Sequence, residues 1–129
     1  MMFDWQPEYG VRFAQIDGLH RQVFRAAGDL HAAIVAGQPQ DTLAELLARL
    51  VACTRAHFAA EESLMQSSQY PQSARHKAAH EALGERLLAW EQGARPSVET
   101  MQSLKGRLIQ HIDEEDRALG RHLAVRAAR

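Results

Sequence analysis

Histidines and carboxylates at helical spacing are the first feature of this sequence that predicts chemistry. Seven histidines occur in 129 residues, His57 precedes Glu61 by four positions, and His76 precedes His80 by four. On a helix, residues four apart lie on one face, so each pair presents two donor groups in one direction. Imidazoles and carboxylates that converge inside a helical bundle are typical of a transition-metal site. The sequence therefore predicts a metal centre built from helices.

Four helical segments are expected to position these side chains. Helix formers such as Ala, Leu, Glu and Arg recur, and no stretch alternates β-branched with polar residues. Pro, Gly and small polar residues mark connections near 37–40, 67–72 and 93–96. The segments between them are 17–36, 41–66, 73–92 and 97–119, with expected caps at Asp17, Thr42, Ser73 and Ser97. The expected fold is all-α, an antiparallel up-down four-helix bundle.

The whole chain, residues 1–129, is expected to form one domain. The bundle itself covers residues 17–119. Residues 1–16 carry four aromatic side chains and are expected to form an N-terminal arm packed on the outside of the bundle. Residues 120–129 are basic and are expected to form a tail with a short frayed helix.

Every expected helix carries a histidine on its apolar stripe. Burial of a carboxylate without a partner costs several kcal/mol or changes its protonation state. Polar groups on a buried stripe therefore need partners that offset the loss of water. One such histidine alone would indicate an ordinary hydrogen-bonded core residue. Five of them on four helices, together with two suitable carboxylates, favour a metal site. The five histidines are His20, His57, His76, His80 and His111.

Other polar residues are expected to have structural roles. His31 lies about three turns, ~16 Å, from His20 along the helix, and His122 falls in the basic tail. Cys53 is interpreted as a buried, inert thiol. Glu62 and the acidic residues 113–115 are interpreted as solvated helix faces.

Composition narrows the possible partners and the compartment. The net charge of −1 argues against a nucleic-acid binder that works by neutralising phosphates. No apolar run reaches the ~18–20 residues of a membrane span, and no signal peptide is recognised at the N-terminus. A single cysteine indicates a reducing compartment, and we expect a cytoplasmic monomer.

The sequence resembles the hemerythrins, and in particular the single-domain bacteriohemerythrins, in four segments. These are Ile16-Asp17-Gly18-Leu19-His20, His57-Phe58-Ala59-Ala60-Glu61-Glu62, His76-Lys77-Ala78-Ala79-His80 and His111-Ile112-Asp113-Glu114-Glu115-Asp116. Their order and separations fit over nearly the whole chain. The resemblance implies two iron ions joined by an oxo or hydroxo bridge. By matching position, one ion takes His76, His80 and His111, the other takes His20 and His57, and Glu61 and Asp116 bridge them. The second ion then has one ligand fewer, and its open position suits dioxygen.

The angular positions on an ideal helix and the resemblance to hemerythrins favour different residues as the second carboxylate ligand. Asp116 follows His111 by five residues, ~140° away on an ideal helix, whereas Glu115 would share the face of His111. The resemblance favours Asp116, and a local distortion of the helix would reconcile the two. Asp116 is therefore the predicted ligand.

The resemblance also implies an apolar pocket beside the open iron position. Its expected lining is Val23, Phe24, Phe58, Leu108 and Ile112. Three positions depart from the family pattern: Arg107 and Leu83 where aromatic residues are common, and Leu19 where glutamine is usual. Arg107 in particular predicts a wetter pocket mouth and a shorter-lived dioxygen complex.

Reversible dioxygen binding, in a carrier, store or delivery protein without catalytic residues, is the leading functional expectation. A sensor module that acts through a partner is an alternative, although 129 residues leave no room for an attached signalling domain. A di-iron oxidoreductase acting on peroxide, nitric oxide or ferrous iron is another. No Glu-x-x-His sequence occurs, so the ferritin-like class of di-iron site is not expected. A bundle that binds zinc or no metal is the last alternative.

Overall fold

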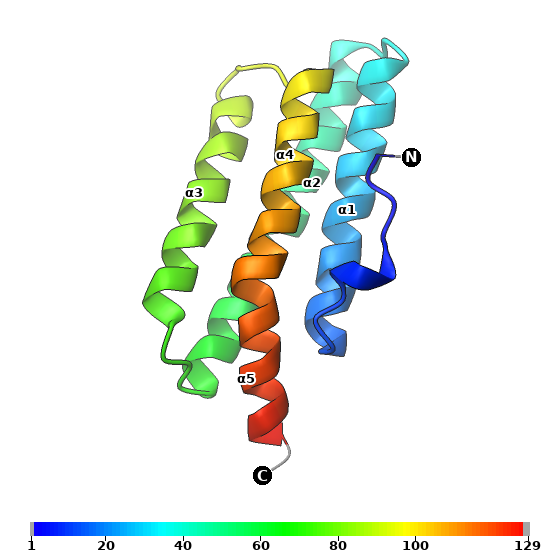
Figure 1. Ribbon diagram of the computed structural model, residues 1–129. Helices are drawn as coiled ribbons and strands as arrows, with labels where there is room; N and C mark the ends of the chain where they lie inside the picture. Colours follow the sequence, from blue (N-terminus) through cyan, green and yellow to red (C-terminus); the bar gives the residue numbers. More distant parts are fainter. Residues whose placement is uncertain (1, 128–129) are drawn as a thin grey trace.

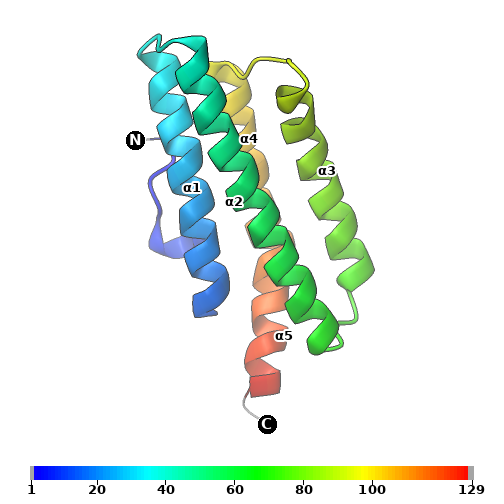
Figure 2. The same ribbon diagram turned by 180° about the vertical axis from the view of Figure 1, so that it is seen from behind.

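The structure is a computed structural model that describes residues 2–127, and its regular elements are helices. After the short 3₁₀ helix η1 (Pro7–Tyr9), four helices run alternately up and down: α1 (Ala14–Val35), α2 (Gln40–Ser67), α3 (Ser73–Glu91) and α4 (Val98–His111) (Figure 1). The π-helical turn η2 (Ile112–Asp116) joins α4 to α5 (Arg117–Ala127), and the three form one continuous rod (Figures 1 and 2). No strand occurs within residues 2–127. The prediction of an all-α, four-helix bundle is confirmed.

Of the four helix caps predicted from sequence, only Ser97 acts as one. The backbone N–H of Thr100 donates to Ser97 Oγ at 3.2 Å, and the N–H of Ser97 donates to Thr100 Oγ1 at 2.7 Å. The other three predictions are wrong, because α1, α2 and α3 begin at Ala14, Gln40 and Ser73 without a side-chain cap. Asp17 instead accepts a hydrogen bond from the backbone N–H of Val11 at 2.8 Å. Asp17 therefore ties the N-terminal segment to α1, which starts three residues earlier than predicted.

The N-terminal arm, residues 2–13 of the described chain, crosses the outside of the bundle beside α1 (Figures 1 and 2). It is shorter than the predicted 1–16, and Met1 lies outside the described residues. Arg117 donates hydrogen bonds to the backbone oxygens of Gly10 at 3.1 Å and Glu8 at 2.9 Å. A Cβ atom at Gly120 would lie 2.5 Å from the carbonyl oxygen of Val11. Glycine at this position lets the arm lie directly on α5.

The basic segment after position 119, predicted to form a short helix, is helical in the part that the structure describes. The rod continues as α5 to Ala127, and residues 128–129 lie outside the described residues. Leu119 and Leu123 are buried on the inner face of this rod. Burial of these two side chains stabilises helix well beyond position 119.

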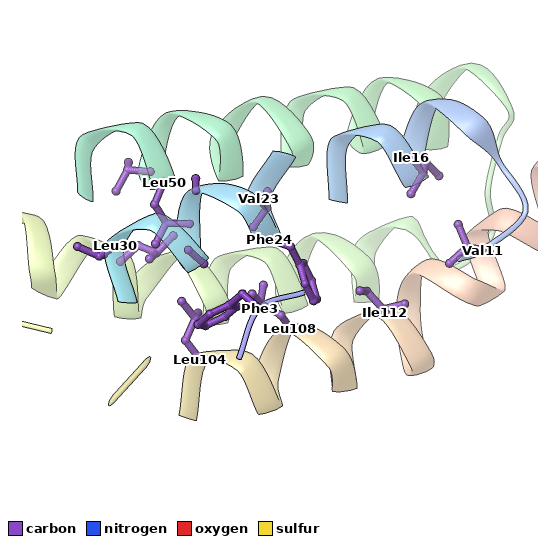
Figure 3. Close-up of a cluster of buried hydrophobic side chains, with 14 of the residues drawn as sticks. Phe3, Val11, Ile16, Val23, Phe24, Leu30, Leu50, Leu104, Leu108 and Ile112 are labelled. Atoms are coloured by element: carbon purple, nitrogen blue, oxygen red, sulfur yellow. The ribbon is translucent and has the colours of Figure 1, made fainter. Parts of the chain in front are cut away.

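Buried apolar side chains lie toward both ends of the bundle. Leu30, Leu50 and Leu104 form part of one end, and Ile16 and Val11 lie toward the other (Figure 3). None of the helices within residues 2–127 is long and apolar enough to cross a membrane. Between these apolar ends the core changes character, because polar side chains fill the interior there.

Candidate metal centre

The structure brings all seven predicted ligand residues together in one buried cluster. The cluster divides into two groups, each with donor atoms within 4.8 Å of one another. One group is Glu61, His76, His80, His111 and Asp116, and the other is His20, His57, Glu61 and Asp116. α1, α2, α3, α4 and η2 each contribute at least one of these residues. Both carboxylates belong to both groups, as expected of residues placed between two ions.

The π-helical turn η2 explains how Asp116 enters the cluster. The backbone N–H of Arg117 donates to the carbonyl oxygen of Ile112, an i to i+5 bond that adds a residue to the turn. Asp116 then lies about one turn after His111, and its Oδ1 is 3.0 Å from His111 Nε2. Glu115 points elsewhere and accepts a hydrogen bond from Arg75 Nε at 3.0 Å. The structure thus places Asp116, and not Glu115, among the clustered donors.

Contacts within the cluster have the distances of hydrogen bonds but often not their directions. Asp116 Oδ2 lies 2.8 Å from His20 Nε2, and Glu61 Oε2 lies 3.0 Å from His57 Nε2. Neither of these oxygens makes a hydrogen bond of acceptable geometry, although both are fully buried. Atoms that crowd together without pairing are directed toward common points. That arrangement fits metal ions, which bind several donors at once, and the imidazole and carboxylate set suits iron.

The two buried carboxylates are strongly acidic. Burial alone would raise the pKa of Glu61 and of Asp116, but the surrounding imidazoles, whose nitrogens lie close to the carboxylate oxygens, hold both pKa values well below the usual range. Burial alone would lower the pKa of His20 and His76, but the same two carboxylates raise each to about 9. Protonated imidazoles therefore balance the negative charge of the two carboxylates when no metal is bound. Divalent cations would replace those protons.

His57 behaves differently from its neighbour His20. Burial lowers the pKa of His57, so this imidazole is neutral where that of His20 is protonated. The two Nε2 atoms are 2.9 Å apart, which suits one proton donated from His20 to His57. Both nitrogens therefore face the same point, as two ligands of one ion would.

His80 is held by two residues outside the cluster. Its Nδ1 donates to Glu62 Oε2 at 3.0 Å, and its ring stacks on Phe58 with centroids 4.1 Å apart. A carboxylate on the far nitrogen of a ligand histidine fixes the ring and raises its basicity. The prediction that Glu62 only forms a solvated face is wrong. The pair joins residues 18 apart on different helices, and nothing in the local sequence marks it.

A small cavity lies beside the group with two histidines. Its polar lining is His20, His57, His111 and Asp116, and its apolar lining is Val23, Phe24, Leu108 and Ile112. Its free volume of about 10 Å³ is close to that of one water molecule. Phe58 is absent from this lining, because its ring lies on His80 instead. Four of the five predicted pocket residues are thus adjacent to the cavity.

Three positions that depart from the family pattern lie outside this lining. Arg107 is exposed on α4, Leu83 is buried on α3, and Leu19 is half-buried on α1. The predicted effect of Arg107 on the pocket mouth is therefore not supported by its position.

The histidines interpreted as structural lie outside both ligand groups. His31 packs edge-on against Phe3, with ring centroids 6.1 Å apart. His122 Nε2 donates to the backbone oxygen of Ser68 at 3.0 Å. Cys53 is free and half-buried rather than fully buried. These contacts are those of ordinary packing residues.

Comparison with known proteins agrees with the geometry. The model of the Hemerythrin HHE cation binding domain matches residues 12–123, which include the whole cluster. The chain is 32% identical over 118 residues to a bacteriohemerythrin of Stenotrophomonas maltophilia, covering 88% of this chain and 76% of that protein. It is 30% identical to a bacteriohemerythrin of Pseudomonas aeruginosa, covering 87% and 75% of the two chains. It is 32% identical to a myohemerythrin of Sipunculus nudus, covering 87% and 86%. The chain belongs to the hemerythrin family.

Proposed function

We propose that this protein binds dioxygen reversibly at a centre of two iron ions. His76, His80 and His111 would hold one ion, His20 and His57 the other, and Glu61 and Asp116 would bridge the two. The division of the cluster into two groups that share both carboxylates supports this assignment. The observation that carries the proposal is the position of the cavity, whose lining includes both histidines of the group with fewer donors and only His111 of the three histidines in the other group.

The protein supplies five donors to one group and four to the other. If an oxo or hydroxo group is shared by both ions, an ion in the larger group would have six ligands and an ion in the smaller group five, which would leave one position open there. His20 and His57 border the cavity, and so the open position faces it. When bound in the ferrous state, two iron ions supply the electrons that dioxygen accepts on binding and returns on release.

The apolar side chains of the cavity control what else reaches this position. Val23, Phe24, Leu108 and Ile112 carry no exchangeable protons, and the free volume leaves no room for a chain of water molecules. A ligand bound there would be shielded from acids that would protonate it and release it as hydrogen peroxide. Glu61 and Asp116 are already committed to the imidazoles, so neither carboxyl offers a proton. This environment favours release of unchanged dioxygen over turnover.

The protein is further proposed to act as a monomer. The exposed large apolar side chains in the described chain are Val35, Leu88 and Val125. They lie on three different helices, α1, α3 and α5, and a few exposed apolar side chains are normal on the surface of a monomer.

Anaerobic loading with ferrous iron, followed by cycles of oxygen and argon, tests the function. We expect two iron atoms per chain and an optical band that appears with oxygen and disappears under argon over repeated cycles. Protein that binds one zinc and no iron would contradict the metal assignment. Rapid conversion of oxygen or added peroxide, with no reversible band, would favour the oxidoreductase alternative.

A further inference from the structure

Phe24 separates the cavity beside the metal centre from a hollow on the surface. The hollow has a volume of about 330 Å³ and is lined by residues of the N-terminal arm and of α1. Phe3, Trp5 and Arg21 are among its lining residues. Among residues 2–127, Phe24 is the only one that lines both this hollow and the inner cavity. One aromatic side chain therefore divides solvent-accessible space from the proposed ligand position.

The ring of Phe24 is packed from outside by the arm. Its centroid lies 5.4 Å from that of Trp5, 5.3 Å from that of Tyr9 and 6.3 Å from that of Phe3. From inside, Phe24 projects from α1 toward the part of the rod that carries Leu108 and Ile112 (Figure 3). The side chain is only 2% exposed. Three rings of one short segment thus hold it in place.

We propose that Phe24 is the gate through which small ligands pass between the surface hollow and the metal centre, and that the N-terminal arm holds this gate closed. The inference rests on the proposed function, since it assigns the access route of that site. Rotation of a buried aromatic ring needs free space beside it. The hollow under the arm offers that space, whereas the cavity, with about 10 Å³, does not. Trp5 and Tyr9 pack against the ring on that side, so Phe24 rotates outward into the hollow only when the arm shifts.

The gate also selects ligands by size. The inner cavity holds about one water-sized molecule, so diatomic molecules and small anions such as azide are the ligand class that fits. The charged residues that line the outer hollow are Arg21, Arg25, Asp4 and Asp29, two of each sign. The hollow therefore carries no net charge that would exclude ligands by their charge.

Stopped-flow association of azide with the oxidised, iron-loaded protein tests the gate. Phe24→Ala removes the ring, and we expect association at least tenfold faster than in the parent protein. Arg117→Gln removes the hydrogen bonds that hold the arm at Glu8 and Gly10, and we expect at least a threefold acceleration. Leu104→Ala is the matched control, because Leu104 is buried in α4 but lines neither space, and its rate should stay within twofold of the parent.

A second measurement does not depend on iron chemistry. Leu108→Ala enlarges the cavity from the α4 side, which should let xenon bind in the zinc-loaded protein. Exchange of that xenon with solvent, followed by ¹²⁹Xe NMR, should become at least threefold faster when Arg117→Gln is added. Unchanged exchange and unchanged azide rates in the Phe24 and Arg117 variants would overturn the gate. If Leu108→Ala alone made azide association much faster than in the parent protein, the ligand route would lie at α4 instead. Failure of the parent protein to bind iron would contradict the proposed function, while the xenon exchange would still decide the gate.

Discussion

Replacement of Asp116 and of Glu115 by alanine, one at a time, tests which of the two side chains belongs to the metal centre. In an undistorted α-helix, residue 115 would face the cluster with His111, and residue 116 would point ~140° away from His111. In the structure, the π turn reverses this, and Asp116 lies 3.0 Å from His111 while Glu115 pairs with Arg75. We expect Asp116→Ala to lose the pair of metal ions and Glu115→Ala to keep it.

The structure sets the size of the two effects. Asp116 belongs to both ligand groups, so its removal leaves four donors in one group and three in the other. Outer partners of metal ligands are worth about 10–100-fold in affinity, and loss of a direct ligand to both ions should exceed about 100-fold. Glu115→Ala leaves every donor in place and removes one ion pair whose Arg75 side chain is 64% exposed. That change should cost about 1 kcal/mol of stability or less.

Metal content after anaerobic ferrous loading and desalting measures the first effect, and chemical unfolding measures the second. Glu114→Ala, at an exposed neighbouring position, controls for the loss of negative charge near the site. Retention of both ions in Asp116→Ala together with their loss in Glu115→Ala would refute the assigned role of the π turn.

Five further outcomes are expected. His111→Ala should lose iron while His122→Ala retains it, as measured by metal analysis, because only the first imidazole lies in the cluster; equal loss would refute the ligand set. Glu62→Gln should weaken metal affinity about 10–100-fold by loosening the ligand histidine that it holds, and unchanged affinity would show that this hydrogen bond is dispensable. His20 and His76 have pKa values of about 9 without metal, so metal binding near pH 7.5 should release about two protons, measurable by calorimetry in buffers of different ionisation enthalpy. Since these pKa values are raised, their contribution to the stability of the metal-free fold is present below pH 6.5 and is lost as the pH rises through about 9. Metal removal should increase hydrogen exchange in α3 before α1, because α3 buries three apolar side chains against seven in α1; equal protection would contradict this order.

The helices and the convergence of the five histidines were predictable because both follow from periodicity. His76 and His80 are spaced for one helix face, and that face is buried in the structure. Histidines on four separate apolar stripes can meet only if the stripes meet, which is what a four-helix bundle requires. The same reasoning succeeds for His20 on α1 and His111 on α4.

Residues whose roles depend on contacts between helices were not predictable in the same way. Glu62 was expected to be solvated, but its partner His80 lies on another helix. Phe58 was expected in the pocket, but its ring stacks on the ring of the same His80. In each case the periodicity predicts the approximate direction of the side chain, but it does not predict which residue of another helix the side chain contacts. The predicted start of α1 was wrong for a related reason, because Asp17 accepts a hydrogen bond from the arm instead of capping its own helix.

The position of Asp116 shows how the polar centre and the apolar ends of the bundle depend on each other. The extra residue in η2 rotates everything after it, so Leu119 and Leu123 reach the core only because the π turn is present. The turn that brings a carboxylate to the metal cluster therefore also sets which face of α5 packs against the bundle. A regular α-helix through 112–116 would turn Asp116 away from His111 and alter the packing of α5 together. Ligand geometry and core packing are thus coupled through a single local distortion of the backbone, and the buried leucines of α5 help to hold that distortion in place.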